Sequence, residues 1–467
     1  MTIAPRLILL LASITLGLVC HTAPLKADIV DQDNTEAVPA FPGAQGFGRY
    51  TQGGRGGTVI KVTNLEDSGP GSLRHAVRQK QPRTIIFEVS GTIPLESELK
   101  INHGHITIAG QTAMGDGITL RNYGMVVNAD EVIVRYVRAR PGNEKGVETD
   151  AISIKSGSDI IIDHCSASWA TDETLSVSPS SKGALRAIDR VTVQWCIISE
   201  SLNSSVHSKG NHGYGSLVRG SAGSRYTFHH NLWAHHQARM PRPGNYTDAA
   251  GDPEGPLFDF RNNVFYNWGS KFSGYNADTR SVSRYNFVKN YYLSGVDSGG
   301  ALAFDESNPL SESHFSGNYM NHEQADDPWS LVQFRDGRAK GSDRPFPAGH
   351  IDTEPAPVAF RRVMEFAGAS IRRDSVDERI ISEVQESGGQ IIDDQMSVGG
   401  WPHLEPGSPR PDKDGDGMPD GWESSLGLDP DDPADGKKDR NADGYTNLEE
   451  YINGLASPAS YRELGND

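Results

Sequence analysis

The chain has 467 residues, enough for one large domain and a small one, and its formal net charge is −17. Such a charge excludes nucleic acid and anionic membrane surfaces as the main partner, because both would repel an acidic protein. The 51 glycines and 27 prolines, together with a hydrophobic content of 36%, are typical of many short strands and turns and not of long helices.

The N-terminus reads as a targeting segment. Arg6 precedes the apolar run Leu7–Val19, and small residues follow up to Ala27, so we expect a secretory signal peptide over residues 1–27. The run is too short to span a membrane comfortably, and no other stretch could span one. Cys20 raises the alternative of a lipoprotein, although the three residues before it match that signal poorly. We therefore expect a chain that is secreted, periplasmic or attached to the cell surface.

Two cysteines remain after cleavage, Cys165 and Cys196. An oxidising compartment permits a disulfide between them. The alternative is a pair of stacked, buried thiols, and the sequence leaves both open.

Short β-branched runs alternate with Gly, Asn and Asp turns from Thr84 onward, and helical periodicity is nearly absent. The segments that we expect to be strands are Thr84–Val89, Ile106–Gly110, Val132–Arg138, Asp159–Asp163, Val191–Trp195, Tyr226–His229, Leu257–Phe260 and Tyr285–Val288.

The ends of these runs form a repeat whose period is roughly 30 residues, which indicates stacked coils. Asn recurs at the third position of the repeat, where it can tolerate a left-handed backbone or bond to the next copy. A solenoid of parallel strands accounts for the short strands and the recurring Asn. A β-sandwich or propeller is the competing fold, but a sandwich needs tight hairpins, and Asn-Gly or Asp-Gly turns are scarce. The aligned strand ends begin at Asp163, Gln194, His229, Arg261, Val288 and Ser316.

The pattern changes after Pro357. Val358–Ala369 has helical character, and Ser375 with Glu378 forms a capping-box signature ahead of a second helix. We expect these helices to pack on the end or side of the solenoid. The predicted organisation is a solenoid over residues 40–345, a helical extension over 346–402, a Pro-rich linker over 403–411 and a separate module over 412–455.

The C-terminal module carries two copies of the calcium-loop pattern, D-x-[DN]-x-[DN]-G-x5-E. Calcium prefers several hard oxygens around a sharp turn, which this spacing supplies. The loops resemble the paired calcium repeats of dockerin-like and thrombospondin type 3 modules, and a structural role is the simplest one. Pro419 argues against a true helix–loop–helix, and a solvated acidic tail is the alternative. No partner for the module can be named. The expected ligands are Asp412, Asp414, Asp416, Asp420 and Glu423 in one loop, and Asp439, Asn441, Asp443, Asn447 and Glu450 in the other.

A second acidic group lies upstream. Glu148 and Asp150 immediately precede the expected strand Ala151–Lys155, and Asp172 and Glu173 precede Thr174–Val177. If successive strand starts stack, these carboxylates converge, and they repel one another unless a cation lies between them. The alternative is that they are ordinary acids of surface turns.

Basic residues cluster downstream, with Arg239 at the centre. The stretch from Arg225 reads as a buried strand followed by a loop that carries Arg239 and Arg242 around a proline. Lys209 lies in a Gly-rich loop, and Arg219 follows it. Each one alone is most simply a solvent-exposed charge, but a strand-to-loop junction is where a scaffold holds a reactive side chain.

The sequence also holds two histidine pairs that invite a zinc interpretation. No HExxH or comparable pattern accompanies them, so we interpret them as packed or hydrogen-bonded wall residues. The pairs are His229-His230 and His235-His236.

Several ordered motifs together resemble the polysaccharide lyase family 1 pectate lyases, over roughly residues 41–345 and the helical extension. The resemblance implies an all-β, right-handed parallel β-helix, dependence on Ca2+ and β-elimination of polygalacturonate. The motifs begin at Phe41 (FPGAQGFG), Asp67 (DSGPGSLR), Phe87 (FEVSGTI), Ile108 (IAGQT), Asp163 (DHCS) and Arg239 (RMPR).

The resemblance also assigns roles. Arg239 matches the catalytic arginine, the proton acceptor, and Glu148 and Asp150 match the first pair of calcium-binding acids. Asp172 matches a later acidic ligand, with Glu173 as its alternative. The family's fourth acid would fall on Ser176, which is not acidic.

The substrate-binding residues match less cleanly. The family's second arginine would fall on Gly244, so Arg242 is the expected substitute. For the substrate lysine we expect Lys209, with His212 and Arg219 as alternatives.

The implied mechanism has a clear electrostatic logic. Calcium would neutralise the C6 carboxylate of the sugar, Lys209 and Arg242 would add positive charge, and Arg239 would take the C5 proton. Arginine has a pKa above about 12, so an alkaline optimum is expected. Calcium would also bridge an acidic enzyme to an acidic polymer, and we expect the enzyme to act as a monomer.

Three alternatives remain open at this point. A β-helix glycoside hydrolase would use two carboxylates and leave no unsaturated product. A pectin lyase, which acts on methyl-esterified polymer, should lack the upstream acidic cluster. A non-catalytic polysaccharide-binding surface protein is the third, because Ser176 and Gly244 depart from the family pattern.

Overall fold

The structure, a computed structural model of the chain, describes residues 1, 37–179, 187–221, 223–335 and 341–456. The expected signal peptide and Cys20 lie outside these residues. None of the helices within them has the length and apolar character needed to cross a membrane.

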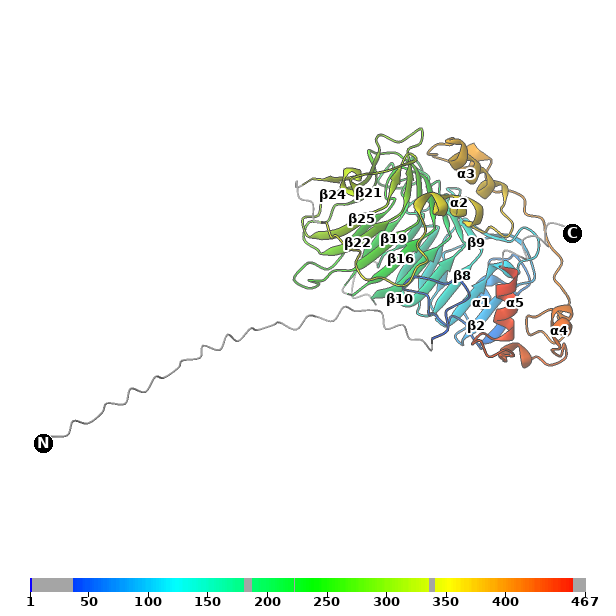
Figure 1. Cartoon of the computed structure of the whole chain (residues 1–467). Helices are drawn as coiled ribbons and strands as arrows, with labels where there is room; N and C mark the ends of the chain where they lie inside the picture. The colour runs from blue at the N-terminus through cyan, green and yellow to red at the C-terminus, as the bar shows by residue number, and fades with distance from the viewer. Residues whose placement is uncertain (2–36, 180–186, 222, 336–340, 457–467) are drawn as a thin grey trace.

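The chain winds into a parallel β-helix, as the sequence predicts (Figure 1). Sheet A holds every strand that the sequence pattern indicates, each shifted by a few residues at most. The expected strand Val132–Arg138 is an exception, because Tyr136 has a left-handed backbone (φ 55°) and divides it into β8 and β9. Sheet A comprises β1 (Thr58–Val62), β2 (Arg83–Phe87), β5 (Ile106–Ala109), β8 (Val132–Arg135), β10 (Ile152–Asp163), β13 (Ile188–Gln194), β16 (Arg225–His229), β19 (Leu257–Arg261), β22 (Ser283–Val288) and β25 (Ser311–Ser316).

In most coils sheet B follows sheet A after a corner of one to three residues, whereas eight residues (110–117) follow β5 before the next strand of sheet B. Its strands pair in parallel, except that β26 and β27 are antiparallel. Sheet B comprises β3 (Gly91–Pro94), β6 (Ile118–Arg121), β9 (Val137–Arg140), β11 (Ser166–Ser168), β14 (Ile197–Ser199), β17 (Leu232–His236), β20 (Val264–Trp268), β23 (Tyr291–Leu293), β26 (Tyr319–Met320) and β27 (Glu323–Gln324).

Sheet C forms the third wall, and the long strand β10 belongs to both sheet A and sheet C. A small sheet lies beyond it, towards the C-terminal coils. Sheet C comprises β4 (Leu99–Ile101), β7 (Met125–Asn128), the start of β10, β12 (Leu175–Val177), β15 (Leu217–Gly220) and β18 (Arg242–Asn245), and the small sheet comprises β21 (Phe272–Asn276), β24 (Leu302–Glu306) and β28 (Val332–Phe334).

The predicted repeat is confirmed by the pairing of the strand ends. Asp163 pairs with Gln194, Gln194 with His229, and the same column continues to Ser316. One detail differs from the expectation. The left-handed backbone belongs to the residue before each Asn, for example His230 (φ 54°) and Asn262 (φ 52°).

The recurring Asn side chains form a hydrogen-bonded ladder between coils. Asn231 donates from both its backbone N–H and its Nδ2 to Asn263 Oδ1, each at 3.0 Å. Asn263 repeats the contacts with Asn290, and Asn290 repeats them with Asn318. Each carboxamide thus satisfies a buried corner of the neighbouring coil, which would otherwise leave a backbone N–H unpaired.

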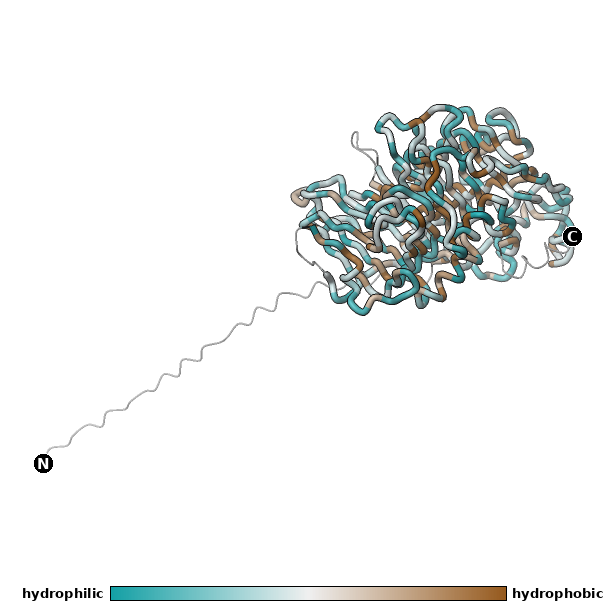
Figure 2. Tube along the Cα trace, turned by 90° about the horizontal axis from the view of Figure 1, so that it is seen from above, coloured by the Kyte–Doolittle hydropathy of each residue, from teal (hydrophilic) through white to brown (hydrophobic). Residues whose placement is uncertain are grey.

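The interior is filled by columns of stacked apolar side chains. One column runs from Val193 through Phe228, Phe260 and Phe287 to Phe315, with the last rings 4.6 Å apart between centroids. Hydrophobic stretches recur from coil to coil along the solenoid in Figure 2. The core therefore changes from aliphatic to aromatic towards the C-terminal coils.

The two cysteines are neighbours in such a column. Cys165 and Cys196 are both buried and both free thiols. Burial raises the pKa of the Cys196 thiol well above its ordinary value, and the neighbouring Cys165 adds to the effect. Of the two options left by the sequence, the structure has stacked thiols.

Two helices of the extension, α2 (Ala356–Phe366) and α3 (Ser375–Glu386), pack on the side of sheet B (Figure 1). Val363 and Ile380 lie in one apolar cluster with Ile197 of β14. The expected cap is one residue too late, because Asp374, and not Ser375, caps α3 by accepting the N–H of Asp377.

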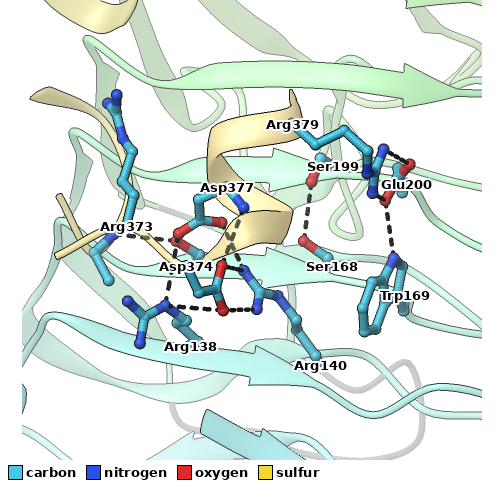
Figure 3. A network of polar contacts seen from close by, with 12 residues as sticks. Arg138, Arg140, Ser168, Trp169, Ser199, Glu200, Arg373, Asp374, Asp377 and Arg379 are labelled. Atoms are coloured by element: carbon cyan, nitrogen blue, oxygen red, sulfur yellow. Dashed lines mark hydrogen bonds and ion pairs between the residues drawn. The ribbon is translucent and has the colours of Figure 1, made fainter. Parts of the chain in front are cut away.

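Buried ion pairs fasten this extension to sheet B (Figure 3). Arg140 Nη2 of β9 donates to Asp377 Oδ1 at 2.7 Å and to Asp374 Oδ1 at 3.0 Å. Asp377 Oδ2 accepts the hydroxyl of Ser166 at 2.6 Å. Because each acid has several partners, the desolvation cost of these charges is offset.

The remaining helices are short and are distributed along the chain. The C-terminal segment does not stand apart from the solenoid: α5 lies beside β2 (Figure 1), and its Leu448 packs with Ile86. The short helices are α1 (Leu73–Val77), η1 (Gly110–Thr112), η2 (Pro328–Leu331), η3 (Gln395–Val398), α4 (Asp420–Leu426), η4 (Asp435–Lys437) and α5 (Asn447–Leu455).

Replacing Asp377 with Ala should remove one of the two buried acids that pair with Arg140, and also the acceptor of the Ser166 hydroxyl. We expect Asp377→Ala to lower the free energy of unfolding by about 3–5 kcal/mol, measured by denaturant titration. Glu378→Ala removes an exposed acid from the same turn and serves as the control. Equal stability of the two variants would show that the pairs do not hold the extension.

Candidate active site

Three carboxylates meet at one point on sheet C. Oxygens of Asp150, Asp172 and Glu173 lie within 4.8 Å of one another. The pairing of Ile152 with Leu175 places the strand starts side by side, and the Glu173 N–H donates to Asp150 Oδ1 at 3.3 Å. The stacking of coils thus brings these acids together, as the sequence predicts.

The electrostatics of the cluster favour a cation. Burial raises the pKa of Asp150 to about 7, and repulsion from Asp172 adds to the shift. The protein therefore keeps carboxylates together at a cost that a positive ion would remove. Hard carboxylate oxygens are the ligands of calcium and magnesium, so this donor set fits a hard divalent cation.

Two positions depart from the expected ligand set. Glu148 is exposed and lies outside the group of three, and its Oε1 accepts the N–H of Ser208 at 2.8 Å. Ser176 is buried and its hydroxyl accepts the N–H of Leu217 at 3.1 Å. The geometry therefore groups three of the four predicted acids, with Asp172 and Glu173 both present instead of one replacing the other.

Two stacked histidines wall off the cluster. The rings of His207 and His212 lie 3.7 Å apart between centroids, and His212 Nε2 is 3.0 Å from Asp172 Oδ1. His207 Nδ1 accepts the N–H of Lys209 at 3.1 Å, so a neutral ring carries its proton on Nε2, which faces Asp172 at 3.5 Å. Burial opposes ionisation of Asp172, but the hydrogen bond from His212 lowers its pKa overall. Both imidazoles direct Nε2 at Asp172, and the Nδ1 of His207 already accepts a hydrogen bond. His207 therefore has no free nitrogen lone pair for a metal ion.

Arg239 reaches the cluster from a later coil. Backbone bridges from Glu173 to Tyr214 and from Tyr214 to Ala238 align these coils. Arg239 has a left-handed backbone (φ 63°), and its Nη1 contacts Glu173 Oε1. The guanidinium lies 4.2 Å from the centre of the Tyr214 ring. Burial lowers the pKa of Arg239 below its ordinary value.

Arg219 and Arg242 lie next to Arg239 and share one acid, Asp278. Arg219 Nη2 donates to Asp278 Oδ2 at 2.9 Å, and Arg242 Nη2 is 3.8 Å from Asp278 Oδ1. Arg219 pairs with Gly244, where an added Cβ would lie 3.4 Å from the Arg219 guanidinium carbon. Asp278 Oδ2 would lie closer still, at 2.5 Å, so Asp278 and Arg219 together fill the space next to Gly244, where the family pattern has its second arginine.

The other predicted basic and histidine residues have different surroundings. Lys209 is exposed on its loop, and its backbone N–H donates to His207 Nδ1. The histidine pairs at 229–230 and 235–236 are buried wall residues: His236 Nδ1, for example, lies 2.7 Å from Ser201 Oγ. Among the described residues, neither pair belongs to a group that could hold a metal.

The C-terminal loops form two further groups. In the first loop, Asp412, Asp414 and Asp416 converge, whereas Asp420 Oδ1 accepts the N–H of Lys413 at 2.7 Å and turns away. Glu423 groups with Asp416 and with a residue that the pattern does not include, Asp435.

The second loop is more exposed. Asp439, Asp443 and Glu450 converge there, while Asn441 Oδ1 accepts the N–H of Asp443 at 3.1 Å. Asn447 is buried and donates to the carbonyl of Asp435 at 2.8 Å, so its amide bridges the loops.

Comparisons with known proteins point to one family. No protein-family model matches the chain. "Probable pectate lyase C" of Aspergillus terreus is 36% identical over 448 residues, which cover 92% of this chain and 96% of the relative. The same protein of Emericella nidulans is 36% identical over 449 residues, covering 92% of this chain and 95% of the relative. The chain belongs to the pectate lyase family.

A solved structure, a pectate lyase from Bacillus sp. N165 in complex with trigalacturonate, is 17% identical and covers 69% of this chain and 98% of that one, with a TM-score of 0.49. The family assignment depends on the sequence relatives, whose length the chain matches almost completely.

Four residues of this candidate site were not predicted from the sequence. His207, Tyr214, Tyr275 and Asp278 all contact a predicted site residue or lie against one. His207 and Tyr214 stand in the Gly-rich loop that drew attention to Lys209, and that loop was the only signal. Tyr275 and Asp278 come from a later coil, and only the register of the strands brings them here.

The Asp150→Asn variant should relieve repulsion in the cluster while keeping the hydrogen bond from the Glu173 N–H. In the presence of a chelator, we expect it to be more stable than the parent protein by about 1–3 kcal/mol, measured by thermal unfolding. Glu312→Gln removes an exposed charge from β25 and should change nothing. A destabilised Asp150→Asn protein would show that these acids do not strain one another.

Proposed function

We propose that the chain is a secreted, calcium-dependent pectate lyase that cleaves α-1,4-linked polygalacturonate by β-elimination and leaves a 4,5-unsaturated end. The observation that carries the proposal is the contact between Arg239 and Glu173. It brings a partly buried guanidine directly beside a group of carboxylates suited to a divalent cation. The names of the full-length relatives support the substrate class.

Arg239 is the base in this proposal. An arginine can take a proton only in its neutral form. Burial lowers the pKa of Arg239, and a calcium ion bound to Glu173 would weaken the ion pair that otherwise favours the charged form. Its Nε has no hydrogen-bond partner among the described residues, and the Tyr214 ring fixes the plane of the guanidine. The group is therefore held in place to accept the C5 proton of a sugar in the groove.

Asp150, Asp172 and Glu173 would hold the calcium ion. When bound, calcium neutralises the sugar carboxylate and makes the neighbouring C5–H more acidic. His212 keeps Asp172 ionised and oriented through its 3.0 Å contact. Glu148 lies at the edge of this site. Together with Arg78 and Lys100, it lines a pocket of about 490 Å3.

Arg219 and Arg242 supply fixed positive charge for the polymer's other carboxylates. Asp278 holds both guanidinium groups in one place, so little conformational entropy is lost when substrate binds. Lys209, exposed on the loop above His207, is placed to add a further contact. These cations explain how a chain of net charge −17 can bind an acidic polysaccharide.

The direct test is product formation on polygalacturonate. We expect ultraviolet absorbance of the unsaturated product to rise in calcium, to stop in chelator and to return when calcium is restored. Methyl-esterified pectin should react more slowly, because it lacks the carboxylate that calcium neutralises. Reducing ends without unsaturation would favour a glycoside hydrolase, binding without turnover would favour a non-catalytic protein, and faster pectin cleavage would favour a pectin lyase.

The Arg239→Ala variant tests the base. We expect kcat to fall by about 10²–10⁴-fold with little change in the KM for polygalacturonate, because a general base acts in the transition state. Arg190→Ala removes an arginine of sheet A that pairs with Asp159, and it should keep full activity. An active Arg239→Ala enzyme would refute the assignment.

A further inference from the structure

We propose that Asp416, Glu423 and Asp435 bind a calcium ion that fastens the C-terminal segment to the first coils of the solenoid. The C-terminal segment is residues 412–456. Asp435 lies outside both repeated loop patterns, in the short helix η4 between them. The site is independent of the proposed lyase chemistry, since none of its residues belongs to the cluster on sheet C.

The three acids are buried and point at one another. Their relative exposures are 6% for Asp416, 0% for Glu423 and 4% for Asp435, and one oxygen of each lies within 4.8 Å of the others. Exposed acids often cluster without a ligand, but these three carboxylates are shielded from solvent. Buried carboxylates at such a distance need a positive charge between them.

Among the residues that the structure describes, no basic side chain supplies that charge. Both oxygens of Glu423, Asp416 Oδ2 and Asp435 Oδ1 lack a hydrogen-bond partner within the part of the chain that the structure describes. Nor does any Lys, Arg or His in the same part form an ion pair with these three acids, whereas Asp412 pairs with Lys61 at 2.7 Å. Four buried oxygens are therefore aimed into one space with nothing to bind there except a cation.

The pKa values of these acids also reflect their burial close to one another. Burial raises the pKa of Glu423 to about 7 and that of Asp416 to about 6, and neighbouring acids add to both shifts. The Asp435 backbone is brought close by Gly436, where an added Cβ would lie 2.3 Å from Asp416 Oδ2. Only a residue without a side chain allows this approach, so the chain is shaped to bring Asp435 to the loop.

The site is connected directly to the core. Asp416 Oδ1 accepts the N–H of Met418 at 2.9 Å, and Met418 is fully buried in a cluster with Ile86, Ala109 and Leu448. Ile86 belongs to β2, and Ala109 ends β5. An ion that fixes Asp416 therefore fixes the residue that docks the segment onto sheet A.

The second loop makes a weaker site. Asp439 and Asp443 are exposed, and Glu450 is already neutralised by Arg440 at 2.8 Å. The repeated pattern is the same in both loops, but burial and the added Asp435 distinguish them. We infer that the first loop carries the structural ion.

Hydrogen exchange of the full chain, followed by mass spectrometry, tests the site separately from activity. At a calcium concentration about 100 times Kd, binding should slow exchange in residues 412–436 and in β1 and β2 by about 100-fold relative to chelator. In Asp435→Asn and Glu423→Gln, calcium should no longer protect these peptides, although protection around residues 148–173 should remain.

Asp431→Asn is the matched control, because Asp431 lies in the same segment but is exposed and paired with Lys413. It should behave like the parent protein. In chelator, Asp435→Asn should exchange no faster than the parent, which shows that it folds. Unchanged calcium protection of residues 412–436 in Asp435→Asn, or no protection in the parent protein, would overturn the proposal. Failure of the lyase assay would leave this result unaffected.

Discussion

The parallel register between coils is the constraint on which the site depends. Asp150, Glu173 and Arg239 are far apart in sequence, yet the pairing of β10 with β12 and the bridges through Tyr214 align them. A shift of one residue in any of these strands would turn the side chains to the opposite face. The Asn ladder between sheets A and B fixes the register of the later coils, from the coil of Arg239 onward, by hydrogen bonds between carboxamides. The strand pairings that stabilise the fold therefore also align the residues of the site.

Much of this arrangement is readable from the sequence, because a repeat is a local signal. The strand ends, the Asn column and the acids before two strands all follow from spacing, and the structure brings Asp150, Asp172 and Glu173 together. The ends of elements were harder to predict: α3 begins after Asp374, since an Asp there competes equally well for the cap.

Contacts between distant coils could not be read in this way. Asp278 and Tyr275 have no pattern of their own, and they meet the arginines only through the stacking of later coils. The packing of the C-terminal segment on the solenoid was also not predicted, because the Pro-rich stretch before it suggested a separate module. In the structure, Met418 and Leu448 are buried against sheet A. Single apolar residues in a polar segment give little warning of the surface that they cover.

The pKa values of the buried acids shift in both directions, and the clustering of acids separates the proposed cation sites from single raised acids such as Glu306. At Asp163 and Asp374 the charged partners outweigh burial: His164 and Arg135 hold the pKa of Asp163 well below its usual range, and Arg140 does the same for Asp374. At Asp259 burial outweighs the pairing with Arg261 and raises the pKa. At Asp150, Asp416 and Glu423 burial wins, and the pKa values rise to about 6 or 7. A fold that supplies so many arginines to buried acids elsewhere leaves these carboxylates without one. Because each of them faces other acids of its own group, the missing charge is most simply that of a divalent ion, at the active site and at the C-terminal loop alike.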